Sequence, residues 1–411
     1  MDANQAFIAN IAILEEEFRR ETWFNTLWGQ FFRGSVKKIT DDNGNEDFIL
    51  SGKPIETLTE PIKKGRDNIL LPFLRRLTGL PVLGDTQEKG TGEEMTMWFL
   101  RSYLNQERKA VTEKEGEMSE QRQKIYNMME KAKPQLSEWW SQWINQNVFR
   151  AFYEGISYNL SQTNTDEGLG IYKRYHPNWY VNAGGVLTAV GTDKQTKTAD
   201  QLDTAVTACD TDMGTAILAQ FRIQLMKLRI PKLVTEGGMK FWMLIVHPDT
   251  GRSLLDDSSN QVRSAFDGAQ KLHPELQGAV GMMGGFVIFE DLVGIRGWNS
   301  GNDVFFGVDD VDVFTYSGET TNFNSLAIGA SAMGHAIGRD LRFTREVDDH
   351  ENTIEIGSAF THGFNRPDYF AEDDAFESTG DAFRKNTTGG VAGDLVAINQ
   401  SSAILMTGED H

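Results

Sequence analysis

Aspartates are the residues whose spacing most resembles a reactive site. They occur in four close groups, which are Asp256 with Asp257, Asp309 and Asp310 with Asp312, Asp348 with Asp349, and Asp373 with Asp374. Carboxylates held near one another can bind a divalent cation or act as general acid and base. The groups therefore raise the hypothesis of a soluble Asp-dependent hydrolase. The alternative is a solvated surface, because a chain with 59 acidic residues produces such pairs routinely.

The remaining candidate chemistry is weaker. The sequence contains no phosphate-binding Gly-x-x-x-x-Gly-Lys loop, no His-Glu-x-x-His, no Gly-x-Ser-x-Gly and no cysteine pair. Its single cysteine, Cys209, is expected to be a small buried residue, and His247 a hydrogen-bonded turn residue before a proline. We therefore predict that the chain is not an enzyme and has no catalytic residue, cofactor or metal site.

Arginines and aromatics alternate along one predicted hairpin. The runs 69–77 and 95–104 are apolar and can pair as strands around a glycine-rich, polar connection over 79–94. A long hairpin of this kind is only marginally stable alone, and arginines form bidentate bonds with carboxylates. We predict an arm that lies on a neighbouring subunit, although solvated arginines remain the alternative. The candidate inter-subunit contacts are Arg75, Arg76, Trp98, Arg101 and Arg108.

A long amphipathic helix is predicted after this hairpin, from Met118 to Ser157. Its apolar residues recur at steps of three and four, which is the helical period. They are Ile125, Met128, Met129, Ala132, Leu136, Trp139, Trp140, Trp143, Ile144, Val148 and Phe152. Pro134 interrupts the stripe and is expected to kink the helix or split it in two.

The other elements are predicted from local patterns. Residues 1–34 form one or two amphipathic helices, which either pack on their own domain or lie on a neighbouring subunit. A hairpin spans 36–50 around Asn43–Gly44. Helical stretches are predicted from Thr198 through Leu228, and a further helix over 251–272. Strands are predicted at 240–246, 286–289, 304–306, 311–314 and 353–364, with a closing strand pair over 391–406. The small-residue segment 324–338 is either a packed helix or a strand–turn element.

Composition limits the function classes. With 411 residues, of which 39% are hydrophobic, the chain can form two or three domains, or one discontinuous pair, with a real core. A net charge of −19 argues against a protein that binds nucleic acid by neutralising phosphates. No targeting or membrane segment is evident, so synthesis in the cytoplasm is the simplest interpretation.

The hairpin and the start of the helix carry a family resemblance. The motifs are Leu74-Arg75-Arg76-Leu77-Thr78-Gly79, Gly84-Asp85, Glu93-Glu94, Arg108 with Ala110-Val111, and Gly116-Glu117-Met118-Ser119-Glu120-Gln121-Arg122. They resemble the major capsid proteins of tailed bacteriophages, in the branch typified by podoviruses that carry a virion RNA polymerase. The resemblance is strong over residues 68–155 and colinear to the C-terminus. Lys109 stands where the family usually has histidine, and the hairpin tip is altered at 90–94.

The resemblance implies an α+β, Hong Kong 97-like phage capsid fold. It divides the chain into an N-terminal arm (1–66), an E-loop (67–117), the first part of a P domain with its spine helix (118–235), an A domain (236–344), and P-domain return strands with the C-terminal segment (345–411). The implied function is self-assembly into pentamers and hexamers of an icosahedral head around double-stranded DNA, without sequence-specific contact. A portal or tail-tube subunit is the alternative within virion proteins.

The same resemblance implies partners and a location. The partners are further copies of the chain, a separate scaffolding protein, a portal and decoration proteins, and no membrane. The expected location is the virion capsid, assembled in the cytoplasm of the bacterial host.

Overall fold

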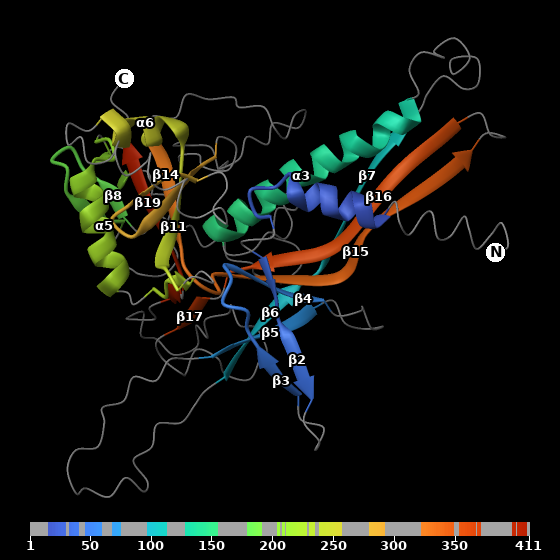
Figure 1. Cartoon of the computed structure of the whole chain (residues 1–411), viewed down its shortest axis with the longest axis horizontal. Coiled ribbons are helices and arrows are strands. Elements are labelled where there is room, and N and C mark those ends of the chain that lie inside the picture. Colours follow the sequence, from blue (N-terminus) through green and yellow to red (C-terminus); the bar gives the residue numbers. More distant parts are fainter. Residues whose placement is uncertain are drawn as a thin grey trace, which may run out of the picture.

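The structure is a computed structural model that describes residues 15–29, 33–40, 46–59, 68–74, 97–112, 128–154, 179–190, 204–205, 208–209, 211–227, 230–234, 238–256, 279–291, 322–348, 353–366, 368–370, 397–399 and 401–408. These residues form two mixed sheets beside one long helix (Figure 1). Within this part of the chain, no helix is long and apolar enough to cross a membrane.

The long helix, α3 (Met128–Glu154), is continuous over 27 residues. Pro134 lies inside it and is exposed, so the predicted split into two helices is wrong. Buried residues lie on both sides of the proline, at Ala132 and Leu136, and their packing keeps the two parts in one helix. The predicted apolar stripe is confirmed from Ala132 onward, and the predicted residues before Met128 lie outside the described chain.

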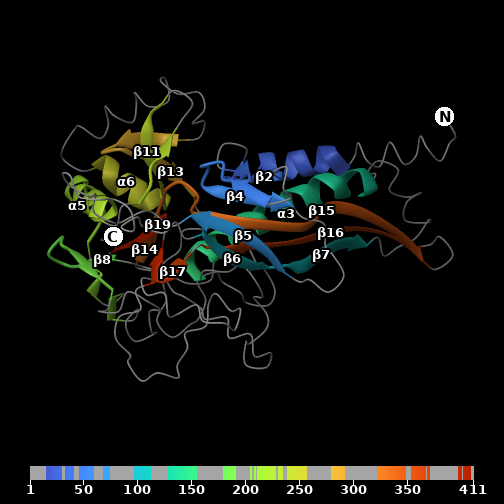
Figure 2. The same ribbon diagram turned by 90° about the horizontal axis from the view of Figure 1, so that it is seen from below.

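A five-stranded sheet lies along this helix (Figure 2). Its order is β1 (Arg33–Ser35), β4 (Ile55–Thr59), β15 (Met333–Asp348), β16 (Thr353–Asn365) and β7 (Asn105–Thr112). The β15–β16 pair is antiparallel and long, whereas β4 pairs in parallel with β1 and β15. The predicted strand at 353–364 is confirmed, and the segment 324–338 is a strand–turn element.

The second sheet has eight strands. Its order is β12 (Ala279–Met283), β13 (Phe286–Glu290), β11 (Lys240–Val246), β14 (Asn322–Ile328), β19 (Ser402–Gly408), β8 (Trp179–Val181) and β9 (Leu187–Ala189), with β10 (Leu233–Val234) on β11. The predicted strands at 240–246 and 286–289 are confirmed. This sheet takes strands from three of the predicted domain segments, and all of them follow the long helix in the chain.

Alternate side chains of the eight-stranded sheet enter two different cores. On β11, Phe241, Met243 and Ile245 join the core that contains the buried residues of α3. Their neighbours Trp242, Leu244 and Val246 face the second core, under α5 (Thr215–Lys227) and α6 (Pro248–Asp256). Because one helix contributes to a core shared by both sheets, it holds the two halves of the molecule together.

Three two-stranded sheets accompany the two larger ones. β2 (Lys37–Thr40) pairs with β3 (Glu46–Ile49), which confirms the predicted hairpin, and β5 (Asn68–Leu74) pairs with β6 (Met97–Tyr103), which confirms the arm hairpin. β17 (Asp368–Phe370) pairs with β18 (Ala397–Asn399). The predicted closing pair over 391–406 is therefore wrong as a pairing, because β19 pairs with β14. The strands predicted at 304–306 and 311–314 lie outside the described residues.

A helix over residues 15–24 packs on α3 and β15. Phe18 is buried against Phe343, with ring centroids 4.2 Å apart, and Lys133 of α3 lies 3.1 Å from Glu17. Of the two predicted arrangements, the described part of the N-terminus therefore adopts packing on its own chain. Phe24 is 84% exposed on its outer side.

The turn between β14 and β15 joins the two sheets and is closely held. Buried Glu56 accepts hydrogen bonds from the amide and hydroxyl of Ser51, the amide of Gly52 and the hydroxyl of Ser331. Ser331 has a positive φ of 51°. A carboxylate with this many donors fixes a turn that the backbone alone would not favour.

Gly329 in this region is expected to tolerate no side chain. Its amide donates to the Ser401 carbonyl at 2.7 Å, and a Cβ would lie 2.1 Å from the Pro231 carbonyl oxygen. Because that contact is with backbone, Gly329→Ala should lower the free energy of unfolding by about 2 kcal/mol. Urea unfolding measures it, with Gly184→Ala as the control, where the nearest contact is an ordinary 3.4 Å. Equal stability of the two variants would contradict this packing.

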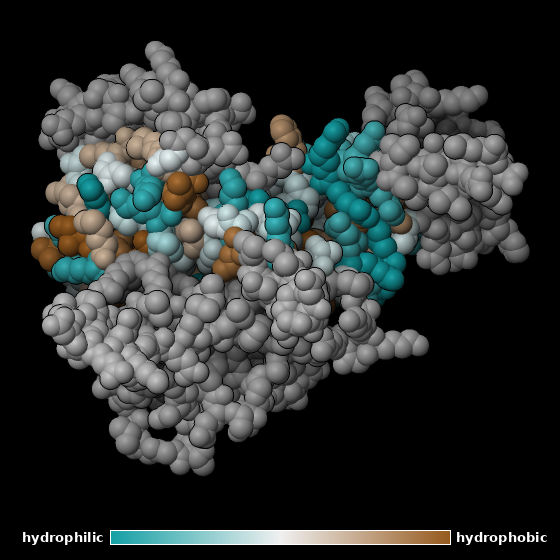
Figure 3. All heavy atoms as spheres, turned by 60° about the horizontal axis from the view of Figure 1, so that its bottom comes forward, coloured by the Kyte–Doolittle hydropathy of each residue, from teal (hydrophilic) through white to brown (hydrophobic). Residues whose placement is uncertain are grey.

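The two ends of the molecule differ in surface chemistry. On the face shown in Figure 3, apolar side chains gather at the end occupied by the eight-stranded sheet and hydrophilic ones at the opposite end. Large exposed apolar residues of that sheet and of α5 are Val186, Ile223, Met226 and Val234.

Candidate functional site

The predicted contact arginines fall on the hairpin and the strand after it. Arg108 is exposed in β7, and the backbone of Trp98 and Arg101 lies in β6, opposite Phe73 and Leu70 of β5. Arg75 and Arg76 lie outside the described residues. Their proposed roles between subunits concern other copies of the chain and stay predictions.

The aspartate groups receive no support as a reactive site. Asp256 ends α6 and Asp348 ends β15, while the other predicted aspartates fall outside the described chain. Among the residues with described positions, no group of three or more His, Cys, Asp or Glu side chains could hold a metal ion.

The predictions for two isolated residues are confirmed. Cys209 is a small buried residue of the core that contains α3. His247 follows β11, where its Nδ1 accepts a hydrogen bond from the Asp249 amide at 3.3 Å and lies 3.1 Å from the Asp249 carboxylate. Both side chains are therefore held in place within the fold, as predicted.

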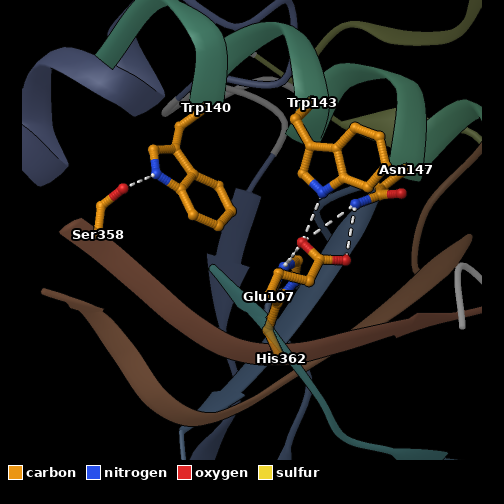
Figure 4. Close-up of polar contacts among 6 residues, drawn as sticks. All are labelled: Glu107, Trp140, Trp143, Asn147, Ser358 and His362. Carbon is orange, nitrogen blue, oxygen red and sulfur yellow. Dashed lines mark hydrogen bonds and ion pairs between the residues drawn. The ribbon is translucent and has the colours of Figure 1, made fainter. Parts of the chain in front are cut away.

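Glu107 of β7 is the centre of a polar cluster that joins β7, α3 and β16 (Figure 4). Its Oε2 accepts a hydrogen bond from Trp143 Nε1 at 2.6 Å, and its Oε1 accepts one from Asn147 Nδ2 at 3.2 Å. His362 Nε2 of β16 lies 3.2 Å from the same Oε2. One carboxylate thus joins strand β7 to the long helix and to the neighbouring strand β16.

Local periodicity explains why these side chains meet. Trp143 and Asn147 are four residues apart on α3, so they lie on one helix face. In the sheet, Glu107 is opposite Phe360, and His362 is the next residue on the same face of β16. The strand therefore presents Glu107 to the helix and Arg108 to the other side.

A second connection runs in parallel with the first. Trp140 Nε1 donates to Ser358 Oγ at 2.6 Å, and Ser358 Oγ donates to the Lys109 carbonyl at 3.1 Å. Trp140 is fully buried and meets Phe360 edge-on, with centroids 6.2 Å apart. Helix α3 is thereby bonded to β16 and, through Ser358, to the backbone of β7.

Lys109, where the sequence departs from the family pattern, also contacts the helix. Its Nζ lies 5.1 Å from the ring centroid of Trp139, and Trp139 stacks on Trp143 at 5.6 Å. A cation over an indole face is favourable. Both Glu107 and Lys109 therefore hold β7 against α3 on either side of the exposed Arg108.

We name the six residues of Figure 4 the β7 clamp: Glu107, Trp140, Trp143, Asn147, Ser358 and His362. Both carboxylate oxygens of Glu107 are engaged within the chain, so the clamp is suited to fixing the position of a strand rather than to turning over a substrate. β7 directly follows the β5–β6 hairpin. The clamp therefore fixes the position of the strand into which the hairpin continues.

The sequence analysis did not identify Glu107. Of its partners, Trp143 was predicted only as part of the apolar stripe, and Asn147 and His362 were not predicted. The available signal was the alternation in 107–111, where Glu107, Lys109 and Val111 share one face and Arg108 and Ala110 the other. Without a partner for either face, that alternation does not identify which residue bonds to the helix.

Comparison with known proteins gives a consistent result. A family model described as phage capsid protein matches residues 32–381. The capsid of Ralstonia phage GP4 has a TM-score of 0.60 and 16% identity, and the match covers 94% of this chain and 92% of that one. Among curated protein sequences, none matches the chain.

Two further solved structures are similar. The acid-stable capsid of Helicobacter pylori bacteriophage KHP30 has a TM-score of 0.53 and 11% identity, covering 87% of this chain and 88% of that one. The head of Helicobacter pylori bacteriophage KHP40 has a TM-score of 0.52 and 12% identity, covering 88% of each chain. The predicted α+β, Hong Kong 97-like capsid fold is thereby confirmed.

Proposed function

The chain belongs to the phage capsid protein family, and from this premise we propose that it assembles into the pentamers and hexamers of an icosahedral head that encloses phage double-stranded DNA. The observation that carries the proposal is the hairpin β5–β6, whose strands pair with each other in a sheet of their own. Strand β7 continues from it into the β7 clamp.

The mechanism is geometric. A two-stranded hairpin is marginal alone, so it gains most of its stability when it lies on another surface. The β7 clamp fixes its base relative to α3, and the surface of a neighbouring copy completes its burial. Identical chains that contact one another through different patches close into rings and shells. Local ordering of the hairpin is therefore coupled to assembly.

The charge of the chain supports both the proposed contacts between subunits and the proposed enclosure of DNA. Arg75, Arg76, Arg101 and Arg108, with Trp98 among them, suit carboxylates on a neighbouring copy, because the chain has 59 acidic and 40 basic residues. A net charge of −19 also suits a wall that encloses DNA without adhering to its phosphates. No sequence-specific DNA contact is proposed.

The proposal includes the organisation and partners that the family implies. The segments are an N-terminal arm (1–66), E-loop (67–117), P domain (118–235 and 345–411) and A domain (236–344). A separate scaffolding protein, a portal and decoration proteins complete the head, which assembles in the cytoplasm of the bacterial host. The subunit works without cofactor, metal or catalytic residue.

Removing the hairpin arginines is expected to block assembly without unfolding the chain. The triple change Arg75→Ala, Arg76→Ala and Arg108→Ala should reduce the yield of closed particles at least about tenfold, because interface arginines are often hot spots. The assay is sedimentation and negative-stain microscopy after co-expression with the scaffolding protein.

The control has the same charge change elsewhere, with Arg222, Lys227 and Lys240 all replaced by alanine; these residues are exposed. Particle yields that fall equally in both triple variants would contradict a specific role for the hairpin. Rings of fixed size in place of shells from the unaltered chain would favour a portal or tail-tube subunit.

A further inference from the structure

His335 of β15 is a buried histidine outside the β7 clamp. Its side chain is fully buried, and neither ring nitrogen has a hydrogen-bond partner. The ring stacks on Phe364 at 4.1 Å, meets His362 edge-on at 5.4 Å, and lies 5.7 Å from the ring of Trp23. A histidine that is buried without partners costs stability, so its position calls for an explanation.

The nearest charge from the N-terminal side is positive. Arg33 of β1 places its guanidinium 4.0 Å from the ring centroid of Trp23 and donates from Nε to Thr57 Oγ1 at 3.1 Å. Thr57 of β4 is the register partner of His335. Burial lowers the pKa of Arg33 to about 10, partly offset by Asp340, but this still leaves a cation at neutral pH.

The carboxylates near this cluster are engaged elsewhere. Glu107 of β7 lies beside His362, at 3.2 Å from its Nε2. Glu56 of β4 is bonded to the turn residues described above, and Asp340 of β15 acts on Arg33. Among the described residues, no carboxylate forms an ion pair with His335, whose surroundings are aromatic rings, His362 and the cation.

A proton on His335 is therefore disfavoured in the closed structure. Burial is the main cause, and the positive charge of Arg33 and the proximity of His362 add to it, so that the pKa of His335 lies well below its usual value. An exposed histidine keeps an ordinary pKa near 6.5. Any motion that opens this cluster to water thus lets His335 take up a proton.

We propose that His335 is an acid-operated latch for the N-terminal helix: the neutral ring lets Trp23 close over the cluster, and protonation releases residues 15–29 from β15. The inference concerns the single chain and does not rest on shell assembly.

The N-terminal helix is held on β15 by side-chain contacts. Phe18 packs on Phe343, Arg19 donates to the Leu341 carbonyl at 2.7 Å and lies 3.6 Å from Asp340, and the Phe343 amide donates to Glu15. The segment is also anchored on α3, by the Lys133–Glu17 ion pair and by the fully buried Trp28, which packs on Phe149 and Phe152. By contrast, β15 is paired with β4 on one side and with β16 on the other. A helix held on a strand by side-chain contacts opens from it at lower free energy than a strand that is paired on both edges.

The direction of the pH effect on opening of the N-terminal helix follows from proton linkage. The open state binds one more proton than the closed state at any pH between the two pKa values, so acid favours opening. The opening constant rises by up to about tenfold per pH unit below pH 6.5, or up to about 50-fold between pH 6.5 and 4.5. Above pH 6.5 the opening constant is expected to be flat.

Hydrogen exchange of the full-length free chain between pH 7.5 and 4.5 tests this. After correction for intrinsic exchange, protection over residues 15–29 should fall in acid, while β11 stays protected. His335→Phe keeps an aromatic ring and removes the titrating group, so its protection over 15–29 should lose the acid dependence. His247→Gln, which changes a histidine outside the cluster, should behave like the unaltered chain.

Two results would overturn the latch: protection over 15–29 that does not change with pH, or the same acid dependence in His335→Phe. If His335→Phe does not fold at pH 7.5, Arg33→Met replaces it. Removing the guanidinium charge makes a proton on His335 less unfavourable, so the ratio of opening between pH 4.5 and 7.5 should shrink. An unchanged ratio would also overturn the proposal.

Discussion

Replacing Glu107 by alanine is expected to lower the free energy of unfolding by about 3 kcal/mol. The change leaves Trp143 Nε1, Asn147 Nδ2 and His362 Nε2 without their shared acceptor, in positions where water does not easily replace it. Urea unfolding followed by tryptophan fluorescence measures the loss. The slope of the transition should be unchanged if the variant alters stability and not compactness.

Two matched variants separate the clamp from its surroundings. Glu107→Gln retains an oxygen acceptor at nearly the same place and should cost about 1 kcal/mol. Arg108→Ala, the exposed neighbour, should change the stability of the free chain by less than about 0.5 kcal/mol. If Glu107→Ala were as stable as Arg108→Ala, the clamp would have no energetic role.

Replacing Trp140 by alanine is expected to cost about 4 kcal/mol. The side chain is fully buried between the helix and β16, so the change leaves a large cavity and removes the bond to Ser358 Oγ. The measurement is again the free energy of unfolding in urea, at pH 7.5, where the His335 cluster is closed.

Controls distinguish the cavity from the hydrogen bond. Trp140→Phe keeps most of the ring volume and loses the indole N–H, so a cost nearer 1–2 kcal/mol is expected. Phe24→Ala removes an aromatic ring that is 84% exposed and should be within about 0.5 kcal/mol of the unaltered chain. A Trp140→Ala variant as stable as Phe24→Ala would contradict the packing of α3 on β16.

Local patterns predicted the elements better than their assembly. The continuous apolar run of β11, the pairing of β2 with β3, and the stripe of α3 all appear in the structure as predicted. Each of these signals lies within a few residues of sequence. Pro134 was interpreted from its intrinsic effect on a helix, and tertiary packing on both of its sides outweighed that effect.

Pairing between distant strands could not be derived from such signals. β19 pairs with β14 and β8, and β4 pairs in parallel with β15, across long separations in the chain. Strand patterns specify which face is buried but not which strand lies next to it. The family resemblance supplied the fold class, but it did not specify these registers.

The predicted contact arginines stay predictions. They were selected for their chemistry, and Arg108 is exposed in β7. Glu107 was missed because its partners are 36, 40 and 255 residues away. Only the fold brings them within hydrogen-bonding distance. His335 gave no signal either, because a histidine in a run of small residues does not reveal its aromatic neighbours.

Cryo-electron microscopy of the chain co-expressed with its scaffolding protein tests the central claim most directly. We expect closed particles with fivefold and sixfold capsomers, in which density for the β5–β6 hairpin lies on a neighbouring copy and β7 remains clamped to α3. Monomers under all conditions, or an open ring about a single symmetry axis, would contradict the proposed function.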